Sequence, residues 1–349
     1  MILISIIMST LNTPERYLRQ SIESILNQTF KDFEFIIVDD GSLGKDIEII
    51  ESYNDPRIHV IKNAVNKGLP YSLNEAIKQS IGKYIARMDS DDIALPHRLE
   101  KQYRYMENHK DVQVLGAVAR TFGKIKKTII SPQYDDINEQ LFFRSSIVHP
   151  SVMIRRDFLM ENGLLYNESF MCSQDFELWS RIVCNGKISI IPEVLMMYRT
   201  HESQISSSKA ELQKEYGYII YQNLFKRLGV IISREEYEAH YSLVNDKVAP
   251  SYSDLLHWCK KLSNAKRNQC IHKKAFFQRQ IYYYLVRNTL GHLAFRNYKF
   301  DVDKFKVIIN PVFEYCFFSE SFRRGINRIA LLIFKNKMNT SVKRMIKSF

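Results

Sequence analysis

Hydrophobic positions in the first hundred residues alternate between two spacings. Short apolar and β-branched runs predict buried strands at 2–8, 33–38, 58–61 and 84–88. Apolar residues three and four apart predict helices at 14–28 and 45–53, and further helical faces at 73–81 and 95–106. Strands that alternate with helices imply an α/β fold, with a mostly parallel, Rossmann-like sheet and helices on both faces.

Local signals mark two helix ends in this region. Thr13 is a suitable N-cap for the first helix, with Pro14 as its first residue. Gly82 follows the third helical face and is a natural C′ residue.

Acidic residues cluster where two of the strands end. Asp39 and Asp40 follow the second strand, and Asp89, Asp91 and Asp92 follow the fourth. Ligands of such sheets bind beyond the carboxyl ends of the strands. Carboxylates two residues apart can face a divalent cation, because Mg²⁺ and Mn²⁺ prefer oxygen ligands. The alternatives are a helix cap at 91–92 and a solvated turn at 39–40.

The pattern is less regular from about residue 110. The expected elements are a strand at 112–118, helices at 157–163 and 176–184, and a short strand at 188–191 that ends before Pro192. The polar stretch 206–208 can link two domains. The chain beyond it is predicted to be helical, basic and rich in Tyr and Phe.

Three further polar residues have two interpretations each. Asp175 precedes an apolar helical stretch, where an acid can stabilise the helix N-terminus or act as a general base. His149 and His201 are isolated in the sequence, and each can be a structural residue or part of a site. None of the three identifies a function by itself.

The order of these features resembles glycosyltransferase family 2, the inverting enzymes with a GT-A fold. The likeness covers about residues 1–206 and is closest to the subgroup that builds bacterial capsule, O-antigen and related surface polysaccharides. The stretches that carry it are Ser5–Asn12, Ser24–Phe30, Val38–Ser42, Asn66–Leu69, Leu73-Asn74, Tyr84–Asp92, Pro96 with Arg98–Glu100 and Gln102, His149–Met153, Gln174-Asp175 with Leu178-Trp179, and Tyr198–His201 with Gln204 and Ser206.

The resemblance implies a hexosyl- or N-acetylhexosaminyltransferase that uses a nucleotide diphosphate sugar, with a UDP-sugar expected, and Mn²⁺ or Mg²⁺. The acceptor it implies is a glycan or a lipid-linked saccharide. Asp175 matches the family's catalytic base, Asp89 and Asp91 its Asp-x-Asp metal motif, and His201 a position that can complete the metal or diphosphate site. The donor-binding residues that it implies are Thr10, Asn12, Asp39, Asp40, Asn66, Gly68, Asn74, Arg87, Asp89 and Ser90.

Three positions depart from the family's usual pattern. Leu11 stands where many members have an aromatic residue that stacks on the nucleobase, so the base is less constrained. Gln174 replaces an acid, which leaves Asp175 as the candidate base, with Glu177 two residues further on. Leu73 stands where other branches of the family have an arginine, so one possible hydrogen-bond donor to the nucleotide is missing.

Charge is distributed unevenly along the chain. The net charge is +12, of which residues 1–209 contribute −2 and residues 210–349 contribute +14. This asymmetry predicts two domains with different partners. We expect a GT-A catalytic domain over 1–206 and a basic, mainly helical domain over 207–349.

The final segment, 321–349, has eight Lys and Arg residues and no acidic residue. Its apolar residues share helical faces, so it is predicted to form a basic amphipathic helix. Such a helix can lie on an anionic membrane surface, where lipid-linked acceptors are found. The alternative is a helix that packs on the catalytic domain with a solvated basic face.

The five cysteines are odd in number and irregularly spaced, which argues against a disulfide framework and a zinc site. Reduced thiols are therefore expected. The sequence shows no signal-peptide pattern and no apolar stretch near the ~20 residues that span a bilayer. These features predict a cytoplasmic protein that does not cross the membrane.

Two other function classes deserve comparison. The basic C-terminal half is compatible with a nucleic-acid-binding protein, but helix-turn-helix and zinc-finger spacings are missing, and without a metal the acidic clusters would repel phosphate. A nucleotidyltransferase also uses acidic metal sites, but it needs a glycine-rich basic loop after the first strand. Ser9–Asn12 contains neither Gly nor Lys, and no dinucleotide-binding glycine pattern follows it.

Overall fold

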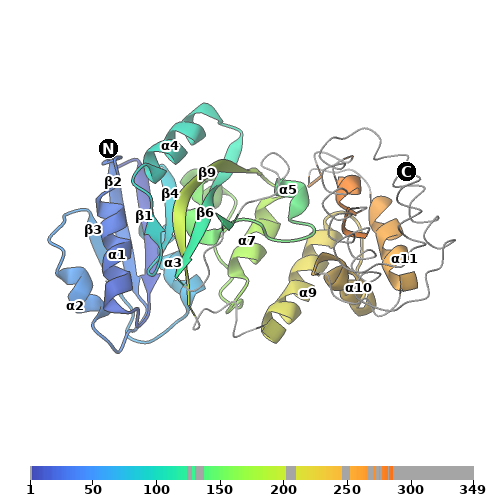
Figure 1. The fold of residues 1–349 in the computed structure, drawn as a ribbon, viewed down its shortest axis with the longest axis horizontal. Coiled ribbons are helices and arrows are strands. Elements are labelled where there is room, and N and C mark those ends of the chain that lie inside the picture. The colour runs from blue at the N-terminus through green and yellow to red at the C-terminus, as the bar shows by residue number, and fades with distance from the viewer. Residues whose placement is uncertain are drawn as a thin grey trace, which may run out of the picture. The chain divides into compact units, whose positions relative to one another are not determined.

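The apolar runs at the start of the chain form four parallel strands in the computed structural model (Figure 1). The structure describes residues 2–123, 128–129, 137–201, 210–245, 252–265, 270–271, 275, 277–281 and 283–285. The four strands lie in the order β3-β2-β1-β4 and are β1 (Ile4–Thr10), β2 (Phe33–Asp39), β3 (Ile58–Lys62) and β4 (Tyr84–Asp89). Because they run in one direction, their carboxyl ends meet at one edge of the sheet.

Helices cover both faces of this parallel part. α1 (Glu15–Leu26) and α2 (Asp46–Glu51) connect strands that are added on one side of β1, whereas α3 (Leu69–Gln79) returns to β4 on the other side. Such crossovers are right-handed, so α1 and α2 lie on one face and α3 lies on the opposite face. Leu18, Ile22 and Ile25 of α1 are fully buried in the core beneath them.

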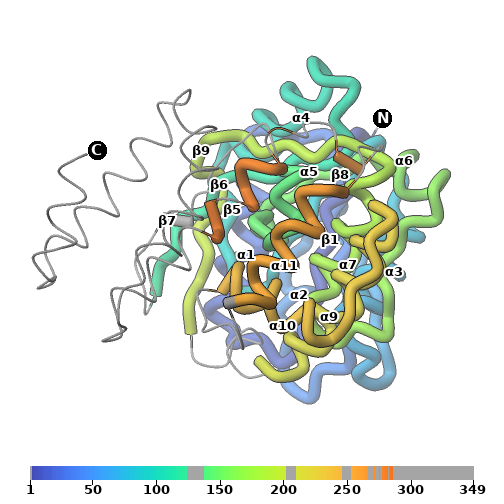
Figure 2. The backbone as a smooth tube through the Cα atoms, turned by 90° about the vertical axis from the view of Figure 1, so that its right-hand side faces the viewer, coloured from blue at the N-terminus to red at the C-terminus, as the bar shows by residue number. Residues whose placement is uncertain are grey.

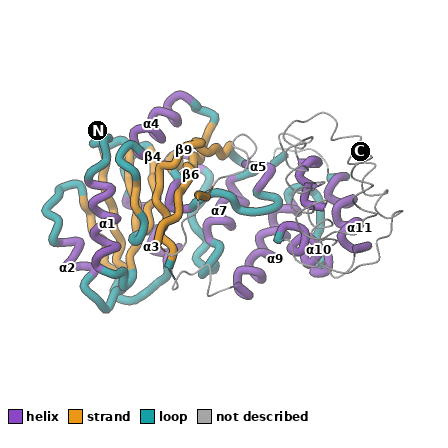
Figure 3. The backbone as a smooth tube through the Cα atoms, viewed as in Figure 1, coloured by secondary structure: helices purple, strands orange, loops and turns teal. Residues whose placement is uncertain are grey.

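The remaining strands make the sheet mixed (Figure 3). β8 (Met153–Arg155) is antiparallel to β4 and to β6 (Val112–Gly123), and β9 (Lys187–Thr200) is parallel to β6. The two-residue strands β5 (Ile93–Ala94) and β7 (Thr128–Ile129) pair antiparallel with β9 and β6. The described residues thus contain one nine-stranded sheet. It confirms the α/β fold class, with its continuous parallel part limited to β3-β2-β1-β4.

Further helices accompany the mixed part of the sheet. They are α4 (Arg98–Asn108), α5 (Ile137–Gln140), the 3₁₀ turn η1 (His149–Ser151), α6 (Arg156–Glu161), α7 (Gln174–Ile182) and α9 (Ala210–Lys226). α7 and α9 lie side by side (Figure 2). Together with β9, these elements extend the fold beyond the parallel strands.

β9 continues through Pro192, so the prediction that this strand ends before Pro192 was wrong. The register against β6 changes from Ile191 opposite Ala117 to Val194 opposite Val118. Pro192 lies in this bulge, where a residue without an N–H group removes no ladder hydrogen bond. The strand therefore reaches Thr200 and brings its last residues to the end of β4.

Two predicted helix ends were also wrong. Pro14 is the N-cap of α1, and the hydroxyl of Thr13 instead lies 2.9 Å from the hydroxyl of Thr10. α3 ends at Gln79, so Gly82 is not its C′ residue. Gly82 packs against β1, where an added Cβ would lie 2.6 Å from the Ser5 backbone nitrogen. Close packing therefore explains this glycine.

The chain divides into two compact units. Residues 1–231 with 267–273 form the first, and the described residues of 232–266 and 274–349 form the second. In the second unit, α10 (Arg234–Val244) and α11 (Tyr252–Ser263) pack together, and the indole of Trp258 donates a hydrogen bond to His240 at 3.1 Å. Helices predominate in this part of the chain, as predicted.

Two predictions concern segments outside the described residues. The boundary at residue 206 lies within 202–209, and the basic segment 321–349 lies beyond residue 285. Both stay predictions. Among the residues that the structure does describe, no helix has the length and hydropathy needed to span a bilayer.

Cys184 and Cys270 form a disulfide, so the expectation of reduced thiols was wrong for this pair. The other two described cysteines, Cys172 and Cys259, are buried. The bond joins residues 86 positions apart in the sequence, at the end of α7 and in the segment that returns to the first unit. Cysteine count and spacing give no information about such a distant contact.

Reduction of this disulfide is expected to lower the melting temperature of the protein. The chain-entropy model gives about 4–5 kcal/mol, as an upper estimate, for a closed loop of 86 residues. Calorimetry of the oxidised protein with and without dithiothreitol measures the shift. A Cys184→Ser/Cys270→Ser variant should melt like the reduced wild type and be insensitive to reductant. Equal melting temperatures for oxidised and reduced wild type would contradict this prediction.

Candidate active site

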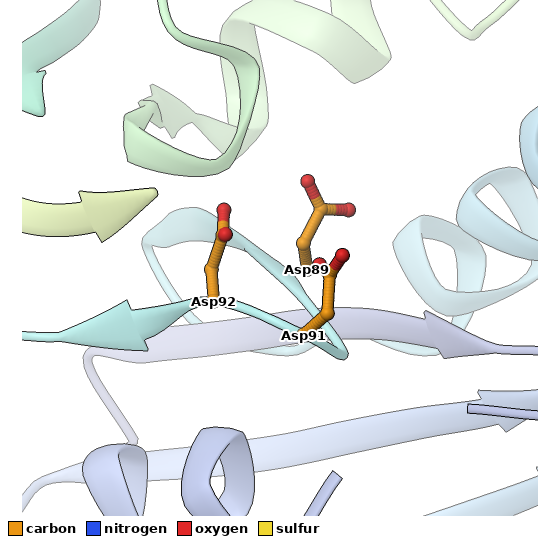
Figure 4. A group of neighbouring side chains, drawn as sticks. All are labelled: Asp89, Asp91 and Asp92. Carbon is orange, nitrogen blue, oxygen red and sulfur yellow. The ribbon is translucent and has the colours of Figure 1, made fainter. Parts of the chain in front are cut away.

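β4 ends in a turn whose three carboxylates lie close together. Oxygen atoms of Asp89, Asp91 and Asp92 all lie within 4.8 Å of one another. Figure 4 shows the three side chains projecting to the same side of this turn, which we call the acidic turn. Burial, followed by the charges of Asp89 and Asp91, raises the pKa of Asp92 well above its ordinary value. Burial also raises the pKa of Asp89.

The atoms of the acidic turn suit a hard divalent cation. Asp92 is 1% exposed, and its Oδ2 atom is buried without a hydrogen-bond partner. Its Oδ1 atom accepts a hydrogen bond from the backbone N–H of Arg199 at 2.8 Å. An unpartnered buried carboxylate oxygen is costly unless a cation, a proton or a water compensates it. Clustered carboxylate oxygens are ligands that Mg²⁺ and Mn²⁺ prefer.

Two nitrogen-bearing side chains contact carboxylates of the acidic turn. Arg87, which is buried on β4, forms an ion pair with Asp89 through Nη2. His201, directly after β9, lies 2.8 Å from Asp91 between its Nε2 atom and the Oδ2 atom. The Nε and Nη1 atoms of Arg87 are buried without a partner. The predicted metal residues Asp89, Asp91 and His201 are therefore brought together.

The loop after β1 is fastened by a residue that the sequence did not single out. Asp46, in the first turn of α2, accepts hydrogen bonds from the Thr10 hydroxyl at 2.5 Å and from the Thr13 backbone N–H at 3.0 Å. Asn12 has a left-handed backbone (φ 50°), and its side chain accepts from Leu43 at 2.9 Å. These bonds hold the loop at the carboxyl edge of the sheet.

The two carboxylates at the end of β2 are buried and accept hydrogen bonds from neighbouring loops. Asp39 accepts a hydrogen bond from the backbone of Ser42 at 3.1 Å. Asp40 accepts from the side chain of Asn63 and from the backbone N–H groups of Lys67 and Gly68, at 2.8–2.9 Å. Asp40 thus shapes the loop before α3.

Three more of the residues predicted to bind the sugar donor lie on neighbouring segments. Asn66 is exposed and accepts from Gly68, which has φ 93° and caps α3. The Ser90 hydroxyl lies 2.8 Å from that of Thr13, which joins the acidic turn to the loop after β1. Asn74 lies elsewhere: its amide exchanges two 2.9 Å hydrogen bonds with the backbone of Tyr166.

Asp175 lies in the first turn of α7, after Ser173, whose backbone is left-handed (φ 59°). It is partly exposed, and burial raises its pKa. Its charge contributes to the raised pKa of Asp89, and the charge of Arg87 acts on Asp175. The predicted base and the predicted metal residues are therefore electrostatic neighbours.

His149 has a structural environment. Its Nε2 atom lies 2.7 Å from the hydroxyl of Tyr166, and its ring packs edge-on against Trp179. Burial, with a smaller contribution from Arg87, lowers the pKa of His149 well below its ordinary value. The imidazole is therefore neutral at physiological pH.

A cavity of about 410 Å³ lies apart from the predicted site residues. It opens between α7 and α9, and its lining residues are Glu177, Ser180, Arg181, Ile220, Asn223, Lys226 and Arg227. Glu177, the alternative acid near Asp175, forms a two-bond ion pair with Arg181 on this side of α7. That geometry favours Asp175 over Glu177 as the candidate base.

A family model described as "Glycosyl transferase family 2" matches residues 5–179, half of the chain. The chain belongs to glycosyl transferase family 2. The match covers β1 to α7 and therefore includes the acidic turn and Asp175. It ends before the segment of β9 that carries Arg199 and leads to His201.

Curated relatives agree with this assignment. An uncharacterized glycosyltransferase of Methanocaldococcus jannaschii is 43% identical over 225 residues, which are 62% of this chain and 77% of that protein. The O-antigen biosynthesis glycosyltransferase WbnJ of Escherichia coli is 34% identical over 236 residues, 64% of this chain and 90% of that protein. The chain is thus a glycosyltransferase, which decides against the two rival function classes.

Solved structures show the same fold. A crystal structure of S. aureus TarS in complex with UDP-GlcNAc has a TM-score of 0.59 and 17% sequence identity. The superposition covers 86% of this chain and 94% of that chain. At this identity the likeness concerns the fold, and it confirms a GT-A sheet followed by a mainly helical part.

The stability of Asp175→Asn tests the environment of this carboxyl group. The pKa of Asp175 is raised in the folded protein. The stability that its protonated carboxyl group contributes is therefore present at low pH and is lost as the pH rises through the raised pKa. Asn mimics the protonated form. In chelator, the variant should therefore melt above the wild type at pH 7, and the gap should close toward pH 3.8.

The control for this comparison is Asp157→Asn on α6, whose side chain is 78% exposed. A surface substitution of this kind should stay within about 0.5 kcal/mol of wild type. A wild type that is more stable than Asp175→Asn at pH 7 would contradict the assignment of burial as the main influence on Asp175.

Proposed function

We propose that the protein is an inverting, metal-dependent glycosyltransferase that transfers a sugar from a nucleotide diphosphate donor to a hydroxyl group. The observation that supports it most is the convergence of Asp89, Asp91 and Asp92 at the end of β4, in electrostatic reach of Asp175. The three carboxylates of such a site can hold a diphosphate through a cation, and the carboxylate of Asp175 can accept a proton.

Asp89, Asp91 and His201 would hold Mn²⁺ or Mg²⁺. A bound divalent cation neutralises the negative charge that develops on the diphosphate leaving group. Arg87 offsets negative charge of the acidic turn through its ion pair with Asp89. This arrangement limits the repulsion among the carboxylates before the substrate binds.

Asp175 would act as the general base. It takes the proton of the acceptor hydroxyl as that oxygen bonds to the anomeric carbon and the carbon–diphosphate bond breaks on the opposite face. One displacement inverts the anomeric configuration. Burial raises the pKa of Asp175, and a more basic carboxylate is a better proton acceptor. A positioned base typically contributes ~10²–10⁴-fold.

The nucleoside would lie at the loops after β1, β2 and β3. Thr10, Asp39 and Asp40 fasten these loops, and Leu11 is 40% exposed beside them, where it can contact the base. TarS structures have been solved with UDP and with UDP-GlcNAc. A UDP-sugar is therefore the proposed donor class.

The acceptor is proposed to be a glycan or lipid-linked saccharide of a bacterial surface polysaccharide. WbnJ is named for O-antigen biosynthesis. AmsE of Erwinia amylovora, which is 29% identical over 198 residues, is named for amylovoran biosynthesis. We place the enzyme in the cytoplasm, with segment 321–349 on the anionic inner face of the membrane. Reduced cysteines would have supported a cytoplasmic location. Because Cys184 and Cys270 form a disulfide, the cysteines do not support it.

A donor screen tests the proposed reaction. Purified protein is incubated with UDP-, GDP- or dTDP-sugars and Mn²⁺ or Mg²⁺, and the released nucleoside diphosphate is measured. We expect release from a UDP-sugar that chelator abolishes and that Asp91→Ala and Asp175→Asn reduce by at least ~10²-fold. Asp157→Asn, altered at an exposed position on α6, should retain wild-type activity.

Hydrolysis without an acceptor can be slow, so binding of the same nucleotides is measured in parallel. Metal-dependent release lost in both variants would support the proposal. Neither release nor metal-dependent nucleotide binding with any donor would contradict it.

A further inference from the structure

Arg199, near the end of β9, is bonded to the acidic turn and to α1. Its backbone N–H donates to Oδ1 of Asp92 at 2.8 Å. Its Nε atom donates to the backbone carbonyl of Asp91 at 2.6 Å, and Nη2 donates to the side chain of Gln20 at 2.8 Å. One residue therefore ties together the acidic turn, β9 and α1.

Two aromatic rings fix the orientation of this guanidinium group. Its central carbon lies 4.0 Å from the ring centroid of Tyr17 and 4.4 Å from that of Phe122. The residue is only 7% exposed. A planar guanidinium group stacks in this way and directs N–H groups in its own plane, which a lysine ammonium cannot do.

The end of β9 is itself held against β6. The Thr200 hydroxyl donates to the backbone carbonyl of Phe122 at 2.9 Å. Gly123 has φ 92°, and an added Cβ there would lie 2.7 Å from the Thr200 carbonyl oxygen. These contacts hold β9 against β6 directly after Arg199, and His201 follows two residues later beside Asp91.

We propose that Arg199 is a positioning residue that sets the metal affinity of the acidic turn. The inference rests on the proposed metal-dependent function. Carboxylates this close repel one another, so without an external tie the turn can open when no cation is bound. Arg199 fixes the backbone at Asp91 and one oxygen of Asp92. These bonds would keep the Asp91 carboxylate and the unpartnered Oδ2 atom of Asp92 in the acidic turn, where a cation would bind. In this proposal Arg199 acts on the cation through Asp91 and Asp92.

Arg199→Lys is the sharpest test, because it keeps the charge and the backbone bond to Asp92 but loses the directed bonds to Asp91 and Gln20. Mn²⁺ affinity is measured on the full-length protein by electron paramagnetic resonance of free Mn²⁺, with and without UDP. Loss of outer-sphere positioning partners typically weakens metal binding 10–100-fold. We expect a loss of at least about tenfold in this range.

Arg155→Lys is the matched control. Arg155 on β8 also donates to backbone carbonyls, those of Val112 and Met106, and its guanidinium lies 5.4 Å from the ring centroid of Tyr84. It is not bonded to the acidic turn in these contacts. A merely structural effect would lower the melting temperature in both variants, but only Arg199→Lys should lose Mn²⁺ affinity.

A second variant keeps the inference testable if Arg199→Lys does not fold. Gln20→Leu removes the support of Nη2 from α1 and leaves Arg199 in place, and it should weaken Mn²⁺ binding a few-fold. If Arg199→Lys folds and binds Mn²⁺ with wild-type affinity, the inference is overturned. If Arg199→Lys does not fold, unchanged Mn²⁺ affinity in Gln20→Leu overturns it instead. Wild-type protein that binds no Mn²⁺ even with UDP would instead contradict the metal in the proposed function, and the inference with it.

Discussion

The close approach of like-charged carboxylates at the end of β4 is the constraint on which the site depends. Three aspartates within 4.8 Å repel one another, and the surrounding protein restricts access of the water that would screen them. The ion pair of Arg87 with Asp89 and the contact of His201 with Asp91 offset part of this repulsion. The clustered carboxylates and the unpartnered Oδ2 atom of Asp92 fit the divalent cation of the proposed function.

The fold supplies the means of holding this arrangement. Parallel strands bring the ends of β1, β2 and β4 to one edge, and the mixed half of the sheet returns β9 to the same place. Asp46 and Asp40 fasten the loops after β1 and β3 by hydrogen bonds, and Asn74 fastens the segment that precedes α7. The proposed base and metal residues thus lie on elements with little freedom to separate.

Local periodicity was sufficient to predict the parallel strands, the helices between them and the acidic edge. It failed where a distant contact decides the outcome. A bulge against β6 carries β9 through Pro192, and close packing against β1 rather than a helix end explains Gly82. The Cys184–Cys270 bond joins residues 86 apart. Family resemblance placed Asp89, Asp91 and His201 together, but the ties made by Asp46 and Arg199 depend on tertiary contacts that spacing does not encode.

Coupling between cation and nucleotide is the most direct measure of the central claim, that the acidic turn holds a diphosphate through a metal. UDP binding is measured by calorimetry in Mn²⁺ and in chelator, for the wild type and for Asp91→Asn. The account predicts UDP affinity at least about tenfold higher in Mn²⁺ for the wild type, a coupling of ~1.4 kcal/mol or more, and no such gain in the variant. Equal UDP affinity in Mn²⁺ and in chelator for the wild type would contradict it.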